Sequence, residues 1–593
     1  MMKFSVIVPT YNSEKYITEL LNSLAKQDFP KTEFEVVVVD DCSTDQTLQI
    51  VEKYRNKLNL KVSQLETNSG GPGKPRNVAL KQAEGEFVLF VDSDDYINKE
   101  TLKDAAAFID EHHSDVLLIK MKGVNGRGVP QSMFKETAPE VTLLNSRIIY
   151  TLSPTKIYRT ALLKDNDIYF PEELKSAEDQ LFTMKAYLNA NRISVLSDKA
   201  YYYATKREGE HMSSAYVSPE DFYEVMRLIA VEILNADLEE AHKNQILAEF
   251  LNRHFSFSRT NGFSLKVKLE DQPQWINALG DFIQAVPERV DALVMSKLRP
   301  LLHYARAKDI DNYRTVEESY RQGQYYRFDI VDGKLNIQFN EGEPYFKGID
   351  IAKPKVKMTA FKFDNHKIVT ELTLNEFMIG EGHYDVRLKL HSRNKKHTMY
   401  VPLSVNANKQ YRFNIMLEDI KAYLPKEKIW DVFLEVQIGT EVFEVRVGNQ
   451  RNKYAYTAET SALIHLNNDF YRLTPYFTKD FNNISLYFTA ITLTDSISLK
   501  LKGKNKIILT GLDRGYVFEE GMASVVLKDD MVMGMLSQTS ENEVQILLSK
   551  DIKKRDFKNI VKLNTAHITY PLNNKCPQII VSQHDLRALF CCL

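Results

Sequence analysis

Cysteine is scarce in this chain, and its copies are poorly placed for cross-linking. The 593 residues include four cysteines, and only Cys42 precedes residue 576. This pattern excludes a secreted protein built from small disulfide-linked domains. Long apolar runs are missing as well, because no stretch reaches the roughly 18 consecutive apolar residues that would cross a bilayer.

We also expect no leader sequence. The chain starts with MMKFSVIVPTYN, which has the character of a β-strand and lacks the longer apolar core and small-residue cleavage site of a signal peptide. We therefore expect a protein without a transmembrane segment that works in the cytoplasm, including at the inner face of the membrane.

A dominant charge of one sign is the third absence. Lys and Arg number 77 against 79 for Asp and Glu, a net charge of -2 at pH 7. Such balance argues against nucleic-acid binding as the main activity. With 44% hydrophobic and 26% charged residues, the composition is that of a folded protein, and the length suits about three to five domains.

Residues 1–217 predict an α/β domain with a Rossmann-like, mostly parallel sheet. Short apolar runs alternate with amphipathic stretches, and their continuous apolar character indicates strands buried on both faces. The ligands of such a sheet bind outside the carboxyl ends of its strands. The expected strands are 4–8, 36–39, 62–65, 87–91 and 116–119, and the expected helices are 13–26, 44–57, 76–83 and 99–111.

Three regions of different character follow. Residues 218–349 carry apolar residues at helical spacing and predict a helical connector. From residue 350 the apolar period becomes two, which predicts two immunoglobulin-like β-sandwiches, at 350–455 and 456–575. Residues 576–593 continue no pattern, and we expect a non-native or disordered tail, with a short terminal helix as the alternative.

Polar clusters follow four of the predicted strands. Each alone is explained by a helix N-cap or a surface loop. Lys74 is followed by Pro75, so the third cluster is no Walker loop, and no G-x-G-x-x-G follows the first strand. The succession of four such clusters along one edge of the sheet is hard to attribute to chance. The clusters are PTYN at 9–12, DDCSTD at 40–45, NSGGPGKPRN at 68–77 and DSDD at 92–95.

The sharpest of these clusters contains Asp92, Ser93 and Asp94. Two carboxylates one residue apart, at the end of an apolar strand, are costly unless they are paired or bind a metal. Hard oxygen ligands suit Mg²⁺ or Mn²⁺ carrying a diphosphate. An isolated pair of this kind is most often a solvated turn. The interpretation as a metal site therefore depends on the other three clusters.

Together FSVIVPTYN, VVVVDDCSTD, the turn at Arg76 and Asn77, and FVLFVDSDD resemble glycosyltransferase family 2 enzymes of the GT-A fold. The resemblance covers residues 1–215. It departs at Cys42, where the family often has Gly, and we expect the turn there to avoid a positive φ.

The resemblance implies a role for each cluster in binding a UDP-sugar. Asp94 would bind the divalent metal, Mn²⁺ or Mg²⁺. The other expected donor-binding residues are Pro9 and Tyr11 at the uridine, Asp41 at the uracil N3–H, Asn68 and Arg76 at the base, and Asp92 and Ser93 at the ribose and diphosphate.

A charged run from Arg207 onward would ordinarily be a surface loop. The resemblance instead implies a mobile lid over the diphosphate. In that lid Arg207 would clamp the phosphates through bidentate donation, His211 would be a further metal ligand, and Met212 and Ser213 would contact the donor.

An acidic pair, Glu178 and Asp179, begins a predicted helix. The helix dipole alone favours acidic residues in a first turn. In this family such a pair supplies the base, so the resemblance implies that Asp179 is the catalytic base and that Glu178 orients hydroxyls of the acceptor or sugar. One base and one metal imply inversion, with Asp179 taking the acceptor proton as UDP leaves.

The order of domains narrows the resemblance to the poly(ribitol-phosphate) N-acetylglucosaminyltransferases that decorate wall teichoic acid. By that resemblance the donor is UDP-GlcNAc, the acceptor is the C4 hydroxyl of ribitol phosphate in a polyribitol-phosphate chain, and the linkage is β. The C-terminal domains would form a homotrimer. The residues alone indicate only a nucleotide-sugar transferase with an unknown acceptor.

Two questions stay open at this point. Basic residues near the predicted site agree with a polyanionic acceptor, although a solvated face explains them equally well. Three alternatives remain: a transferase for another cell-surface polysaccharide, a nucleotide-sugar hydrolase and a non-catalytic carbohydrate-binding scaffold. A processive synthase is disfavoured, because such an enzyme needs a membrane channel and usually carries a Q-x-x-R-W motif, and this chain shows neither. The basic residues are Lys74, Arg76, Lys156, Arg159 and Lys164.

Overall fold

The computed structural model of the chain divides into two compact units. The first unit comprises Met1–Glu318 and Tyr325–Asp350, and the second comprises Ser319–Gln324 and Ile351–Leu593. The structure describes residues 2–174, 177–207, 217–256, 263–364, 367–375, 377–394, 396–407, 410–421, 427–452, 462–466, 469–479, 481–491, 498–503, 505–510, 521–527, 531–540, 543–549, 560–565 and 569–571.

An eight-stranded mixed sheet forms the centre of the first unit, in the order β3-β2-β1-β4-β9-β6-β10-β8. The strands β3, β2, β1 and β4 run parallel, and β9 runs antiparallel to both of its neighbours. The strands are β1 (Phe4–Thr10), β2 (Phe34–Asp40), β3 (Leu60–Gln64), β4 (Phe87–Phe90), β6 (Val116–Ile119), β8 (Ala138–Val141), β9 (Ile157–Arg159) and β10 (Ile193–Leu196).

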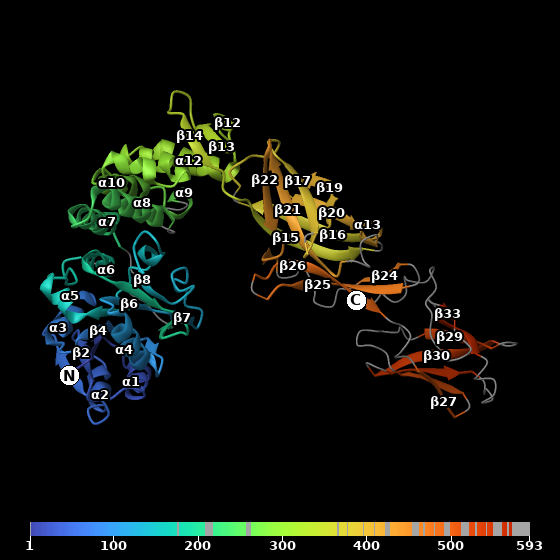
Figure 1. Cartoon of the computed structure of the whole chain (residues 1–593), viewed down its shortest axis with the longest axis horizontal. Helices are drawn as coiled ribbons and strands as arrows, with labels where there is room; N and C mark the ends of the chain where they lie inside the picture. The colour runs from blue at the N-terminus through green and yellow to red at the C-terminus, as the bar shows by residue number, and fades with distance from the viewer. Residues whose placement is uncertain are drawn as a thin grey trace. The chain divides into compact units, whose positions relative to one another are not determined.

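The apolar runs explain why these strands lie in the middle of the unit. Every residue of β1 and β2 is buried, as strands covered on both faces by helices require. The expected α/β domain is confirmed, and Figure 1 shows its helices around the sheet. The helices are α1 (Ile17–Ala25), α2 (Thr47–Glu52), α3 (Gly73–Gln82), α4 (Thr101–His112), α5 (Thr160–Asp165) and α6 (Glu178–Asn189).

A second, three-stranded sheet was missed from the sequence. It has the order β5-β11-β7, with β5 (Tyr96–Ile97), β7 (Met121–Val124) and β11 (Tyr202–Thr205). These strands are too short to show an apolar period. Their position matters, because β5 directly follows the aspartate cluster and β11 precedes the predicted lid.

The connector is helical only in its first part. Its helix α7 packs on α6 and on α10, as Figure 1 also shows. The expectation of helices up to residue 349 was wrong, because its end forms an antiparallel sheet with alternating exposure. The elements are α7 (Pro219–Asn235), α8 (Glu240–Ser256), α9 (Phe263–Lys266), α10 (Gln272–Gln284), α11 (Arg299–Arg306), α12 (Ile310–Gln322), β12 (Arg327–Val331), β13 (Lys334–Gln338) and β14 (Phe346–Asp350).

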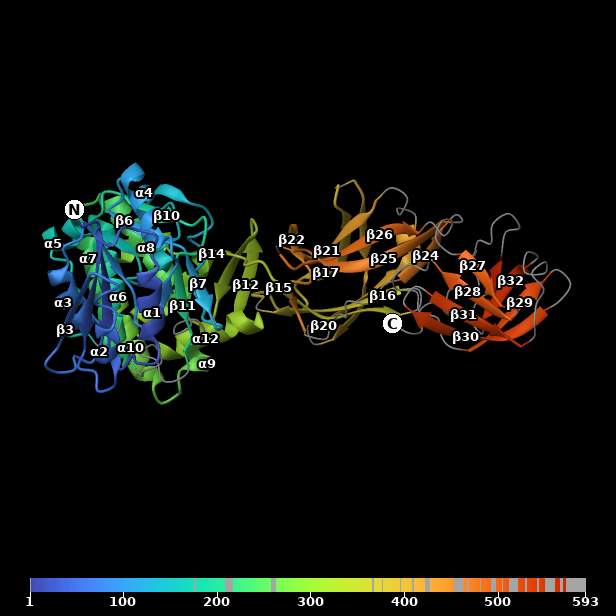
Figure 2. The same cartoon turned by 90° about the horizontal axis from the view of Figure 1, so that it is seen from below.

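The second unit is built from β-sheets whose strands are mostly antiparallel, and Figure 2 shows these sheets. A five-stranded sheet has the order β19-β20-β16-β15-β23, and β18-β17-β21-β26-β25-β24 form another, to which β22 adds. Alternate residues of β17 and β20 are buried, as in a sheet with one face in a core. The strands are β15 (Lys355–Asp364), β16 (Lys367–Asn375), β17 (Asp385–Ser392), β18 (Thr398–Val401), β19 (Leu403–Ala407), β20 (Gln410–Met416), β21 (Ile429–Ile438), β22 (Glu441–Arg446), β23 (Gln450–Arg451), β24 (Ala462–Leu466), β25 (Asp469–Phe477) and β26 (Ile484–Ile491).

The expected boundary at residue 455 was wrong. Strand β26 pairs with β21 through Ile429 and Tyr487, so the first sandwich continues to Ile491. A third sheet in the order β27-β28-β31-β30-β29-β32-β33 follows. Its strands are β27 (Ser498–Lys502), β28 (Lys506–Thr510), β29 (Gly521–Leu527), β30 (Met531–Ser540), β31 (Glu543–Leu548), β32 (Ile560–Thr565) and β33 (Thr569–Pro571). The predicted tail at 576–593 lies outside the described residues.

Among the residues that the structure describes, no helix combines the length and the apolar composition needed to cross a bilayer.

Candidate active site

The parallel strands bring the predicted clusters to one edge of the sheet. Asp41, which follows β2, donates from its backbone N–H to the carbonyl of Thr10 at the end of β1, at 2.8 Å. The hydroxyls of Ser13 and Ser93 lie 2.8 Å apart and connect the loops after β1 and β4. The clusters that follow β1, β2 and β4 therefore form one continuous surface.

The side expected to hold the uridine is organised around Asp41. Its buried carboxylate accepts from the backbone N–H and the hydroxyl of Ser69, at 2.8 and 3.0 Å. Asn68 donates to the Asp41 carbonyl at 2.9 Å. Pro9 is buried within β1, whereas half of the Tyr11 side chain is exposed at the end of that strand. The structure therefore brings Asp41 and Asn68 together beside an accessible aromatic ring.

The turn after Asp41 differs from our expectation. Cys42 has a φ of 64°, in the left-handed region where a side chain is strained. Asp40 explains this conformation, because its carboxylate accepts from the backbone N–H of Ser43 at 2.8 Å and from the Ser43 hydroxyl. The prediction that this turn avoids a positive φ was wrong, since these hydrogen bonds fix the turn regardless of the side chain.

Arg76 connects two parts of the site. Its guanidinium is buried and donates from Nη2 to Asp92 Oδ1 at 2.7 Å and from Nη1 to Glu178 Oε1 at 3.4 Å. Burial lowers the pKa of Arg76, but the charges of Asp92 and Glu178 outweigh it and raise that pKa above its usual value. These contacts join the aspartate cluster to α6, rather than placing Arg76 beside the uridine residues Asp41 and Asn68.

The starts of helices α3 and α6 lie against each other. A Cβ added at Gly73 would lie 3.4 Å from Phe170 Cβ and 3.6 Å from Glu178 Cγ. Asn77 reinforces this contact by donating to the Phe170 carbonyl at 2.7 Å and accepting from its N–H at 2.8 Å. The third predicted cluster therefore positions the acidic pair of α6.

The aspartate cluster contains a third carboxylate that sequence reasoning left without a role. Asp95 is buried and accepts from the Tyr202 hydroxyl at 2.8 Å and the Thr205 N–H at 2.7 Å. Burial, together with the charges of Asp92 and Asp94, raises the pKa of Asp95 to about 8. The only sequence signal was the run of acids itself, because a strand pattern around Tyr202 does not show that β11 lies beside Asp95.

This concentration of negative charge fits a divalent cation. The donors are hard oxygens, as Mg²⁺ and Mn²⁺ prefer, and a cation would relieve the repulsion felt by Asp95. Within the described ranges, no group of three or more His, Cys, Asp or Glu is arranged to hold a metal.

Arg207 lies beside this cluster at the end of β11. It donates from Nε to the Asp94 carbonyl at 2.9 Å and from Nη2 to Glu19 at 2.7 Å, and its guanidinium lies 5.0 Å from the centre of the Tyr16 ring. The expected phosphate clamp is thus next to the expected metal ligand. His211, Met212 and Ser213 fall outside the described residues.

Asp179 occupies the first turn of α6, after Ala177 with its φ of 59°. Although part of its surface is accessible, burial raises the pKa of Asp179 to about 7, and the Glu178 charge adds to this. Arg76 and Lys156 act in the opposite direction. A carboxylate with a pKa near neutrality is suited to accept a proton in catalysis.

Two buried cations lie near Asp179: Lys156, whose burial contradicts its expected role of guiding acceptor phosphates, and Arg253, which was not predicted as a member of the site. Lys156 is 2% exposed, and burial lowers its pKa to about 7. Arg253, on α8 of the connector, is 7% exposed, and burial lowers its pKa to about 10, while the charge of Asp179 opposes that change. A helical pattern does not show that the connector reaches the catalytic domain, so the sequence carried no signal for Arg253.

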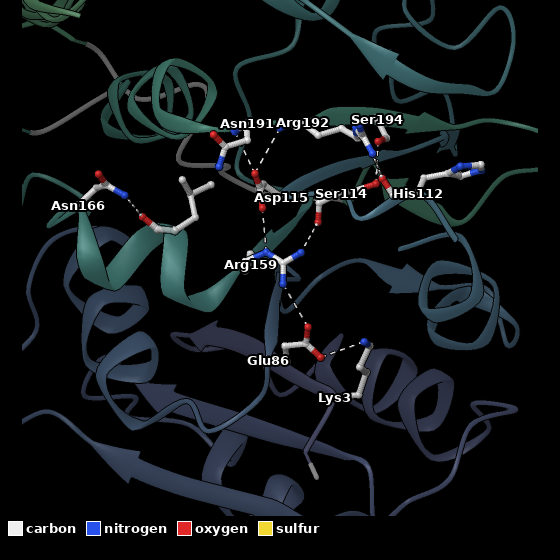
Figure 3. Close-up of polar contacts among 11 residues, drawn as sticks. Lys3, Glu86, His112, Ser114, Asp115, Arg159, Asn166, Asn191, Arg192 and Ser194 are labelled. Carbon is white, nitrogen blue, oxygen red and sulfur yellow. Dashed lines mark hydrogen bonds and ion pairs between the residues drawn. The ribbon is translucent and has the colours of Figure 1, made fainter. Parts of the chain in front are cut away.

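Arg159, which we expected to guide acceptor phosphates, lies at the opposite sheet edge. Figure 3 shows its guanidinium between Asp115 and Glu86, at 2.8 and 3.2 Å, with Lys3 bound to the same glutamate. Because β9 is antiparallel to β4, Arg159 pairs with Phe87 at the start of β4. It therefore ties strand starts together, and the guiding role was wrong.

The other expected guiding lysines also differ from one another. Lys164 donates to the carbonyl of Ala83 at the end of α3, at 2.9 Å, and Lys74 is exposed. Of these two, only Lys74 remains a candidate contact for an anionic chain.

Comparisons with known proteins agree with this architecture. A glycosyl transferase family 2 model matches residues 5–167, and the glycosyl transferase TarS linker domain matches 219–317. The TarS beta-glycosyltransferase C-terminal domain 1 matches 350–488, and the TarS C-terminal domain 2 matches 493–570. The boundary between the last two agrees with the strand pairing.

Two curated relatives are similar over most of the chain. The poly(ribitol-phosphate) beta-N-acetylglucosaminyltransferase TarS of Staphylococcus aureus strain MW2 is 99% identical over 572 residues, covering 96% of this chain and 100% of the relative. A poly(ribitol-phosphate) beta-glucosyltransferase of Bacillus spizizenii is 41% identical over 505 residues, covering 82% of this chain and 78% of the relative.

Solved structures show the same fold. The crystal structure of S. aureus TarS matches with a TM-score of 0.70 and 96% identity, covering 96% of this chain and all of that one. The structure of S. aureus TarS 1-349 in complex with UDP-GlcNAc matches with a TM-score of 0.58 and 99% identity, covering 59% of this chain and all of that one.

The fold and the site thus define a GT-A glycosyltransferase of family 2. Given its identity to the curated relative over their shared length, the chain belongs to the TarS family of poly(ribitol-phosphate) beta-N-acetylglucosaminyltransferases.

Proposed function

We propose that this chain transfers N-acetylglucosamine from UDP-GlcNAc to ribitol-phosphate units of wall teichoic acid, forming a β linkage with inversion. The supporting relatives are a TarS poly(ribitol-phosphate) beta-N-acetylglucosaminyltransferase and a TarS structure in complex with UDP-GlcNAc. The observation that carries the chemistry is the contact chain from Asp92 through Arg76 to Glu178, because it couples a donor-binding cluster to the acidic pair that contains Asp179.

In this mechanism Asp179 acts on the acceptor. It accepts the proton of the ribitol hydroxyl while the hydroxyl oxygen forms a bond to C1 of the sugar. The bond between C1 and the phosphate oxygen breaks at the opposite face, and UDP leaves with that electron pair. The proton ends on Asp179, and the sugar inverts.

The donor is held by the strand-end loops. Asp41, Asn68, Pro9 and Tyr11 hold the uridine, and Asp92 and Ser93 contact the ribose and diphosphate. Asp94 would hold Mn²⁺ or Mg²⁺, whose charge would stabilise the diphosphate as a leaving group.

The lid residues complete the donor site. Arg207 is near enough to Asp94 to donate to the diphosphate, as an arginine fork does well. His211 would join Asp94 at the metal, while Met212 and Ser213 close over the donor.

The remaining parts of the proposal concern the acceptor and the assembly. We assign the C4 hydroxyl of ribitol as the attacking group, and a homotrimer formed through the second unit. The chain acts in the cytoplasm or at the inner face of the membrane, where the nucleotide-sugar donor and the growing polymer meet.

A donor screen tests this function. UDP release is measured with UDP-GlcNAc and UDP-glucose, with and without polyribitol phosphate, and the product anomer is read by NMR coupling. The proposal expects acceptor-dependent release from UDP-GlcNAc and a β product. A preference for UDP-glucose would contradict the proposed donor and would match the 41% identical beta-glucosyltransferase. UDP release that does not depend on the acceptor would indicate a hydrolase.

A further inference from the structure

Lys156 stands at the active-site edge because of the direction of one strand. Strand β9 is antiparallel to β4 and β6, so its first residue, Ile157, pairs with Leu89 and Leu117 further along those strands. Lys156 precedes β9 and reaches the edge where the aspartate cluster follows β4. Arg159, three residues later, lies at the opposite edge. The sequence placed both in one basic patch, and the strand separates them.

The side chain of Lys156 is enclosed beneath α6. Its Nζ donates to the carbonyl of Ser153, and the same carbonyl accepts from the Thr183 hydroxyl of α6 at 3.2 Å. The Tyr187 ring of α6 lies 5.9 Å from Nζ. These contacts fix the ammonium below the helix whose first turn carries Asp179.

A buried ammonium is costly unless a negative charge compensates it. Within the described part of the chain, no carboxylate forms an ion pair with Lys156. The charge of Asp179 acts on the Lys156 ammonium and favours the protonated lysine. In turn, the Lys156 charge favours ionised Asp179. A purely structural role would be served as well by a Met of similar length, without this cost.

Other groups also act on the Asp179 carboxylate, and the Arg76 charge and the backbone N–H of Gln180 favour its ionised form more strongly than Lys156 does. Arg76 on α3 favours the ionised carboxylate, but it is paired with Asp92 and Glu178. Glu178 on α6 opposes ionisation. From the connector, Arg253 on α8 faces the same carboxylate. From β9, Tyr158 is fully buried, and burial raises its pKa, so it stays neutral near pH 7.

We infer that Lys156 is a positioning residue for the base: its buried ammonium favours the ionised form of Asp179, which is the form that accepts the proton of the acceptor hydroxyl. This inference rests on the proposed function, in which Asp179 is the base. Lys156 itself touches neither substrate, and it acts only through the protonation state of Asp179.

The pH dependence of kcat tests this role with Lys156→Met, which removes the charge and keeps the length. The acid limb of the kcat profile should move to higher pH by about one unit or more. At pH 6.5 kcat should then fall about 10-fold, while at pH 9 it should lie within about two-fold of the unmodified enzyme. Lys156→Arg should restore the limb, and KM for UDP-GlcNAc should stay unchanged.

Lys164→Met is the matched control, since it removes the same charge from a lysine that only caps a helix, and its acid limb should not move. An equal loss of kcat at every pH in Lys156→Met, or an unmoved limb, would overturn the inference.

A second measurement does not depend on the folding of Lys156→Met. NMR titration of the Lys156 side chain should show its pKa falling in Asp179→Asn, which keeps the lysine and removes the compensating charge. An unchanged lysine titration would contradict the coupling. Failure of the proposed function reads differently, because Asp179→Asn would then retain full turnover whatever the behaviour of Lys156.

Discussion

Nη2 of Arg76 lies 2.7 Å from Oδ1 of Asp92. Arg76 is buried, whereas 38% of the Asp92 side chain is exposed, so the pair connects the interior to the surface where the donor would bind. The same guanidinium also reaches Glu178 on α6. One buried side chain therefore contacts both the aspartate cluster and the acidic pair.

Arg76→Lys should lower both stability and donor affinity. Lysine keeps the charge but cannot donate to Asp92 and Glu178 with a fork, so two charged hydrogen bonds of a buried group are disturbed. We expect a loss of about 2–3 kcal/mol in the free energy of unfolding, measured by urea denaturation, and weaker UDP-GlcNAc binding by calorimetry. Arg55→Lys, at an exposed pair with Glu52, should leave the free energy of unfolding nearly unchanged. Equal effects of both variants would contradict the role of Arg76.

Cys42→Gly should stabilise the protein. Glycine adopts the φ of 64° without strain, although it also gains freedom in the unfolded chain, so we expect a net increase of up to about 1 kcal/mol in the free energy of unfolding. Thermal melting with and without UDP-GlcNAc measures this. Cys42→Ala is the control, because it removes the thiol and keeps the strain, and it should give no increase. A destabilised glycine variant would show that the thiol, through its contact near the Glu66 carbonyl, matters more than the backbone.

Metal removal should abolish transfer. Chelation by EDTA should stop turnover, and Mn²⁺ or Mg²⁺ should restore it, because the diphosphate otherwise leaves without charge stabilisation. Asp94→Asn should reduce kcat by about 10²–10³-fold and weaken Mn²⁺ binding in the presence of UDP by calorimetry. Asp110→Asn, at a surface pair with Lys3, should leave both unchanged. Full activity of the metal-stripped enzyme would contradict the role of Asp94 as the ligand of a required metal.

Much of the catalytic domain was predictable from the sequence because its strands are buried on both faces. Runs such as those of β1 and β2 can form only interior strands, and parallel strands bring their carboxyl ends to one edge. That argument located Asp41, Asp92 and Asp94. It could not show that Lys156 is buried at that edge while Arg159 lies at the opposite one, because the direction of the three-residue strand β9 depends on its neighbours and not on its own composition.

The errors have physical causes of the same kind. The boundary at 455 failed because a period of two identifies strands but not their partners, and β26 pairs with β21 across a long separation in sequence. The conformation of Cys42 was missed because hydrogen bonds from Ser43 to Asp40 decide it. Long-range pairing and local hydrogen bonding are both invisible in composition.

Assembly should depend on an apolar pair in the third sheet of the second unit. Met535 on β30 is directly opposite Leu547 on β31, and both are more than half exposed, as at many interfaces. Met535→Glu should convert the proposed trimer to monomers in sedimentation velocity while retaining acceptor-dependent UDP release. Leu269→Glu, at a still more exposed leucine of the first unit, is the control and should leave assembly unchanged. If the Met535→Glu variant sediments as the same oligomer as the unmodified protein, the interface does not include Met535.

The transfer rate of Asp179→Asn, measured at saturating UDP-GlcNAc on polyribitol phosphate, tests the base most directly. Asparagine keeps the size of the side chain but cannot take a proton, so kcat should fall by about 10²–10⁴-fold while the Kd for UDP-GlcNAc stays nearly constant. In the unmodified enzyme the pKa of Asp179 is raised to about 7, so kcat should be lost as pH falls through about 7, where the base becomes protonated. The variant should lack that acid limb. An Asp179→Asn enzyme that turns over normally, or one whose donor binding collapses together with kcat, would contradict the account.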